Sequence, residues 1–166
     1  MTRLLLALTI LAAATAPGMA QQKMNMPGID NPAPGAPYHP GLGDLMTAFV
    51  QPRHIKLGLA GVAQNWAYAA YELGELRETF EDVSKLVPKH GNLDIPPAIA
   101  ATVGQPMDAV DAAIKAKDQA AFTKAYADLT TACNACHQSA DHPMIVIQVP
   151  AFTGTGFPDQ DFSPPK

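Results

Sequence analysis

Two cysteines and a histidine near the end of the sequence form the pattern with the clearest chemistry. Cys133-Asn134-Ala135-Cys136-His137 matches the Cys-x-x-Cys-His pattern that attaches c-type haem. On a helix, positions i, i+3 and i+4 share one face. Both thiols can therefore form thioethers with the two vinyl groups along one porphyrin edge, while the His137 imidazole binds the iron. The pattern predicts one covalently attached haem c.

A Cys-x-x-Cys pair also occurs as a thioredoxin-like redox centre, as half of a zinc site or as a structural disulfide. A redox pair is expected beside a strand-helix-strand pattern, and this region has helical periodicity only. A structural zinc site needs two more ligands at motif spacing, and the sequence has two cysteines in all. Haem attachment is therefore the favoured interpretation.

The N-terminal segment has the pattern of a secretory signal peptide, which we expect to span residues 1–20. Arg3 supplies the positive charge, Leu4 to Ala14 form the apolar run, and Gly18 and Ala20 are small residues before a cleavage point. A retained anchor is the alternative, but the run is short for a bilayer. We expect export to the bacterial periplasm, which agrees with haem attachment after translocation, and no stable membrane insertion after cleavage.

The chain has 166 residues, 48% of them hydrophobic, which suits one domain with a sizeable core. Its formal net charge of -4 gives no reason to expect nucleic acid or an anionic membrane as a partner. Residues 21–41, rich in proline and glycine, are expected to form a flexible leader.

Apolar residues at helical spacing predict four helices between residues 42 and 140, and therefore an all-α fold, a four-helix bundle with extended N- and C-terminal tails. The first begins near Leu42, is kinked at Pro52 and ends near residues 61–64. The second follows an Asn65 N-cap and ends at Pro88. After a loop through residues 90–97, the third has a second break or kink at Pro106. The fourth follows an Asp118 cap and carries the haem motif.

The remaining residues, 141–166, are expected to form an extended tail. An apolar run from Met144 to Val149 is predicted to pack as a strap over the end of the bundle that carries the motif. The glycine- and proline-rich part beyond it is expected to stay loose.

The arrangement resembles the bundle-type c cytochromes, that is, cytochrome c′ and its low-spin relatives, which carry the motif on their last helix. It is also similar to small exported bacterial monohaem cytochromes c, through Arg53-His54-Ile55-Lys56-Leu57, Asn65-Trp66 and Ala70-Tyr71-Glu72-Leu73. The resemblance covers roughly residues 41–150. It implies a four-helix fold, one haem and exported redox proteins as partners. Homodimerisation, frequent in this group, is left open.

The sixth iron ligand decides what such a haem can do. The resemblance to low-spin bundle cytochromes implies a methionine on the first helix, and Met46 is the matching candidate. His54 is the alternative, since it lies about 80° from Met46 around an ideal helix and can approach the same cavity unless Pro52 changes the register. Arg53 and Lys56 are candidate partners for the haem propionates.

Two functions follow from these expectations. With six-coordinate iron, the protein transfers single electrons between exported partners. With an open position opposite His137, it binds nitric oxide or carbon monoxide, as high-spin cytochrome c′ does. We expect no enzymatic activity, because no convincing distal acid-base pair is present. His39 and His90 lie in loop-like segments and are given no role, and His142 is placed on the wrong side of the macrocycle to be the sixth ligand.

Overall fold

The computed structural model describes residues 39–150 and 162–165. The predicted signal peptide and nearly all of the predicted leader lie outside the described residues. Within the described part, no helix is long and apolar enough to cross a membrane.

The first helical run has three consecutive parts: α1 (Leu42–Leu45), a π-helical turn η1 (Met46–Val50) and α2 (Gln51–Val62). Its N-terminus is capped by the Asp44 carboxylate, which accepts from the Gly41 N–H at 3.1 Å. Pro52 does not divide the run. The turn before it is widened instead, with the Gln51 N–H donating to the Met46 carbonyl, and a widened turn of this kind often marks a functional site.

The second helix, α3 (Trp66–Leu86), confirms the predicted segment and its cap. The Asn65 side-chain oxygen accepts from the Tyr68 N–H at 3.2 Å. A two-residue antiparallel hairpin, β1 (Lys89–His90) and β2 (Leu93–Asp94), follows. It was not predicted, because its strands are too short to show an alternating pattern. Gly91 adopts the left-handed conformation, with φ of 56°, where the hairpin turns.

Helices α4 (Ile95–Ala116) and α5 (Gln119–Ser139) complete the bundle. The prediction that the loop before α4 extends through Pro97 was wrong, because both prolines of the Ile95-Pro96-Pro97 segment lie in the first turn of the helix, where a missing N–H costs nothing. Pro106 also fails to break α4. The Asp118 cap of α5 is confirmed, since its carboxylate accepts from two backbone N–H groups at 2.9 and 3.0 Å.

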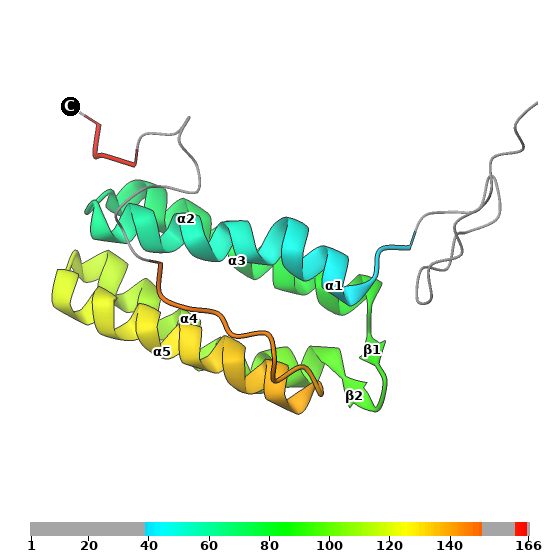
Figure 1. Ribbon diagram of the computed structural model, residues 1–166. Helices are drawn as coiled ribbons and strands as arrows, with labels where there is room; N and C mark the ends of the chain where they lie inside the picture. Colours follow the sequence, from blue (N-terminus) through cyan, green and yellow to red (C-terminus); the bar gives the residue numbers. More distant parts are fainter. Residues whose placement is uncertain (1–38, 151–161, 166) are drawn as a thin grey trace, which may run out of the picture. The chain divides into compact units, whose positions relative to one another are not determined.

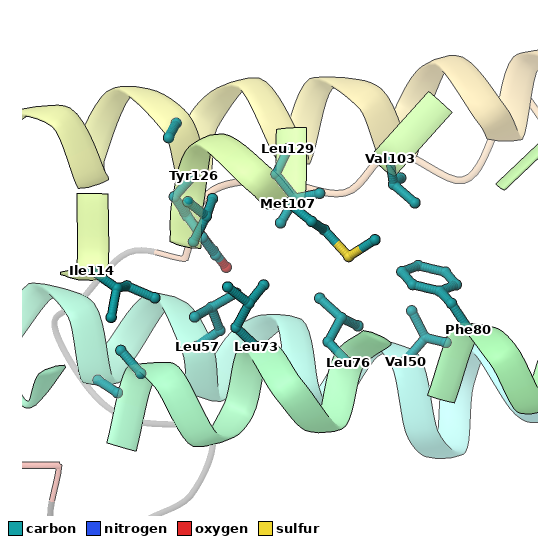
Figure 2. Close-up of a cluster of buried hydrophobic side chains, with 14 of the residues drawn as sticks. Val50, Leu57, Leu73, Leu76, Phe80, Val103, Met107, Ile114, Tyr126 and Leu129 are labelled. Carbon is teal, nitrogen blue, oxygen red and sulfur yellow. The ribbon is translucent and has the colours of Figure 1, made fainter. Parts of the chain in front are cut away.

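These helices form two layers, α2 beside α3 and α4 beside α5 (Figure 1). Figure 2 shows the side chains that fill the space between the layers, drawn from both helix pairs. The fully or nearly fully buried members of this core include Leu57, Leu76, Val110, Phe122, Tyr126 and Leu129. An all-α four-helix bundle is therefore confirmed.

Two glycines of α2 let it approach α5 closely. A Cβ atom at Gly58 would lie 2.6 Å from the Tyr126 ring, and one at Gly61 would lie 2.0 Å from the Phe122 ring. These two rings stack on each other with centroids 5.8 Å apart. Because glycine lowers helix stability relative to alanine, this close approach accounts for both residues.

After α5 the chain reverses at Asp141, whose φ is 61°, and residues 142–150, which we call the strap, run back beside the helix (Figure 1). The strap has no regular secondary structure. Of the apolar run that was predicted to pack on the bundle, Met144, Ile145, Val146 and Val149 are exposed, so the run packs only in part. The described end of the tail is not loose, in contrast to the prediction. Phe162 is buried against Tyr68, and the Asn65 side chain donates to the Ser163 carbonyl at 2.9 Å.

Candidate functional site

One mostly apolar cavity collects most of the residues predicted to have chemical roles. Met46 and His54 reach it from the first helical run, and Cys133, Cys136 and His137 reach it from α5. The empty space between its walls, including the part open to solvent, is about 1110 Å³. Its apolar walls come from several elements and include Leu42, Val50, Phe80, Leu93, Ile95, Ile99, Val103, Ile145 and Ile147.

The two cysteines are half-buried on one face of the last two turns of α5. They are free thiols. Burial raises the pKa of Cys133 to about 11, with a further contribution from Cys136, and burial also raises the pKa of Cys136. A redox-active Cys-x-x-Cys pair needs a lowered pKa and usually lies at a helix N-terminus. The opposite position and the raised pKa values disfavour a thioredoxin-like role.

A zinc role is equally poorly supported. In residues 39–150 and 162–165 there is no group of three or more His, Cys, Asp or Glu side chains that could hold a metal ion. A structural zinc ion needs four such ligands.

His137 follows Cys136 directly, and one of its ring nitrogens has a fixed partner. Nδ1 lies 2.9 Å from the carbonyl oxygen of Ile145 in the strap. Because a carbonyl only accepts hydrogen bonds, Nδ1 carries the proton, and the neutral ring keeps a lone pair on Nε2. A metal-ligating histidine typically has this arrangement, with its second nitrogen donating to a carbonyl or carboxylate. The donor set of the cavity therefore fits a c-type haem.

The two candidates for the sixth ligand differ in how they are held. His54 is buried, with Nε2 3.0 Å from the Thr130 hydroxyl and Nδ1 3.0 Å from the Tyr126 hydroxyl. Burial lowers its pKa to about 4, so the ring is neutral at neutral pH. To bind iron, His54 would have to give up one of these bonds. Met46 is half-buried at the cavity wall, and thioether ligation would cost it no such bond. This difference favours Met46.

Arg53 and Lys56 do not line the cavity with the other predicted residues. The Arg53 guanidinium donates to the Glu72 carboxylate at 3.2 Å and to the Glu75 carboxylate at 2.7 Å, both on α3. Glu72 is 1% exposed, so Arg53 compensates a carboxylate that is taken out of water. Arg53 therefore joins α2 to α3, and the propionate roles of Arg53 and Lys56 stay predictions.

The cavity wall also includes two histidines that were not expected there and two isoleucines of the predicted strap. His90 and His142 both line it, with ring centroids 5.5 Å apart. Ile145 and Ile147 of the strap line it as well. The apolar run of the strap was a signal for these isoleucines. No sequence signal brings His90 to this place, because the hairpin that positions it is only two residues per strand.

The chain was compared with family models, curated proteins and solved structures, and none of them matches. The site is therefore interpreted from its own geometry and from the sequence pattern.

Proposed function

We propose that this protein is an exported monohaem c-type cytochrome that transfers single electrons between partner proteins in the bacterial periplasm. One observation carries the proposal. The Cys-x-x-Cys-His residues of α5 and Met46 of the first helical run, distant in sequence, line the same apolar cavity. A histidine and a methionine are the pair of iron ligands found in cytochromes c.

Each residue then has a role at its own atoms. The Sγ atoms of Cys133 and Cys136 would hold haem c through thioethers, and Nε2 of His137 and Sδ of Met46 would bind its iron. When bound, the haem supplies an iron centre that gains and loses one electron. A thioether ligand raises the potential of such a centre, which suits a carrier.

The rest of the cavity serves this role by controlling water. Apolar residues such as Val50, Phe80 and Val103 line the cavity and give water few hydrogen-bond partners there. Low polarity disfavours extra charge at a buried centre, so these walls also affect the potential. The cavity is partly open to solvent, and an electron carrier needs an edge that partners can approach. The acidic net charge of -4 suits partners with a basic face.

The absorption spectrum of the oxidised protein tests this proposal. Protein is produced in a host that assembles c-type cytochromes, as wild type and as Met46→Leu. We expect a methionine-to-iron charge-transfer band in the wild type and its loss in Met46→Leu. Met107→Leu is the matched control, because Met107 is buried in the core and does not line the cavity.

Two other outcomes contradict the proposed ligand set. A low-spin spectrum that lacks the methionine band in the wild type and becomes high-spin in His54→Gln assigns the sixth position to His54. A high-spin spectrum in the wild type that shifts with added carbon monoxide indicates an open position, and the protein is then a gas-binding relative of cytochrome c′ and not an electron carrier.

A further inference from the structure

Two side chains of the haem motif attach the strap to α5, next to a backbone bond from the His142 N–H to the His137 carbonyl at 2.8 Å. The first attachment is the Ile145 carbonyl, which accepts from His137 Nδ1 at 2.9 Å. The second is Ile147, whose backbone pairs with the side chain of Asn134, the residue that follows Cys133. Both attachments cross from the helix to a segment without secondary structure of its own. Beyond the turn in which the Ile145 N–H donates to the His142 carbonyl at 3.0 Å, these side chains hold the strap in place.

Asn134 makes its attachment with both ends of its amide group. Its Nδ2 donates to the Ile147 carbonyl at 2.8 Å, and its Oδ1 accepts from the Ile147 N–H at 2.7 Å. Only an amide side chain offers a neutral donor and acceptor side by side for one residue's backbone. This pairing reproduces the two-bond exchange between opposite residues of an antiparallel sheet. It fixes which strap residue lies opposite Asn134.

The register of the strap against α5 matters because successive strap residues alternate between the cavity and solvent. Ile145 and Ile147 line the cavity, with Ile147 half-buried and Ile145 44% exposed, whereas Met144 and Val146 are 74% and 64% exposed. In an extended segment, a slip of one residue exchanges the two faces. Such a slip would direct Met144 and Val146 into the cavity and would move the Ile145 carbonyl away from His137. The two hydrogen bonds between Asn134 and Ile147, which we call the Asn134 pair, oppose this slip.

We propose that Asn134 is a positioning residue for His137 and acts through the strap. By holding Ile147, it keeps the Ile145 carbonyl on Nδ1 of His137, which fixes the tautomer and the direction of the ring. A hydrogen bond from Nδ1 also makes the imidazole a stronger electron donor to a bound metal. This redox consequence rests on the proposed haem site, and it predicts that the Asn134 pair lowers the reduction potential.

The test compares Asn134→Leu with Gln138→Leu in the full-length haem protein. Leucine is close to asparagine in size but makes neither hydrogen bond, and Gln138 is an exposed amide one turn further along α5. Two quantities are measured: hydrogen exchange at the Ile147 amide and the reduction potential by spectroelectrochemical titration. In Asn134→Leu we expect faster exchange at Ile147 and a higher potential. In Gln138→Leu both should equal the wild-type values.

A second variant acts on the other partner of the pair. Ile147→Pro removes the N–H that Asn134 accepts from and leaves α5 unchanged, so it keeps the test available if Asn134→Leu does not fold. It should raise the potential in the same direction. An unprotected Ile147 amide in the wild type, or a potential that stays constant in both variants while the strap loosens, overturns the role of Asn134. Failure to bind haem at all overturns the proposed function instead, and Ile147 exchange in the haem-free chain still reports on the Asn134 pair.

Discussion

The close approach of α2 to α5 makes Gly61→Ala a sensitive test of how the cavity is assembled. A Cβ at this position would lie 2.0 Å from Cζ of Phe122, whereas ordinary contacts begin at 3.4 Å. The ring cannot move away easily, because Phe122 is 1% exposed, contacts the edge of Trp66 and stacks on Tyr126. The added methyl group must therefore push the two helices apart or distort the rings.

Two opposing contributions set the size of the effect. Overpacking of a buried site costs about 1–3 kcal/mol, and a clash this short belongs at the upper end. Replacing glycine by alanine inside a helix returns about 1 kcal/mol. We therefore expect Gly61→Ala to lower the free energy of unfolding by about 2 kcal/mol. Gly74→Ala is the matched control, because a Cβ there has nothing within 4 Å. It should be stabilising by about 0.5–1 kcal/mol.

Urea denaturation followed by far-UV circular dichroism measures both variants against the wild type. The reasoning requires opposite signs for the same chemical change at two helical glycines. If Gly61→Ala is as stable as Gly74→Ala, α2 and α5 do not approach as closely as described. The first helical run would then lie further from the motif on α5.

Three further predictions concern charges and thiols. Arg53→Leu leaves Glu72 buried without this partner and should lower the free energy of unfolding, measured by urea denaturation, by about 3 kcal/mol. Arg77→Leu removes an exposed ion pair and should lower it by less than about 1 kcal/mol. Equal losses in the two variants would contradict this. Burial lowers the pKa of His54 from its ordinary 6.5 to about 4, so the unfolded state binds the proton more readily. The free energy of unfolding should therefore fall by up to about 3 kcal/mol as the pH is lowered from about 6.5 to about 4. If His54→Gln has the same pH profile as the wild type, this prediction is refuted. Because burial raises the pKa of Cys133 to about 11, the thiols of haem-free protein should react with iodoacetamide more slowly than glutathione at neutral pH, and faster reaction would indicate an activated thiol.

Much of the helical architecture was predictable from local signals. Asn65 and Asp118 are capping residues whose side chains accept backbone hydrogen bonds at the predicted helix starts. Apolar spacing gave the buried faces, and residues such as Leu76, Val110 and Leu129 lie in the core as expected. Capping and apolar spacing both depend on residues within one or two helical turns of each other, so they can be read from a single sequence.

Proline positions were harder to interpret. Pro52, Pro97 and Pro106 were each expected to bend, break or delay a helix. In the structure, a π-helical turn precedes Pro52, the first turn of α4 contains Pro97, and α4 continues through Pro106. Packing of the surrounding helix can outweigh the local cost of a proline, and the sequence does not show the strength of that packing.

Among the candidate site residues, too, some could be predicted from the sequence and others could not. The haem motif has fixed spacing and was recognisable, Met46 came from the resemblance to low-spin bundle cytochromes, and His54 followed from its angle to Met46 around a helix. Arg53 was expected near the propionates because carboxylates beside a buried cofactor need charge partners, yet its guanidinium pairs with Glu72 on α3. The contact between Asn134 and Ile147 had no sequence signal, because it depends on how the chain turns after α5.

The covalent attachment of haem is tested most directly by denaturing the protein. Full-length protein is matured in a host that assembles c-type cytochromes, unfolded and extracted with acidified organic solvent, and the mass of the polypeptide is measured. We predict that one haem stays with the chain, and that it is released when Cys133 and Cys136 are both replaced by alanine. A wild-type polypeptide that loses all iron pigment in this extraction would contradict the proposed cytochrome.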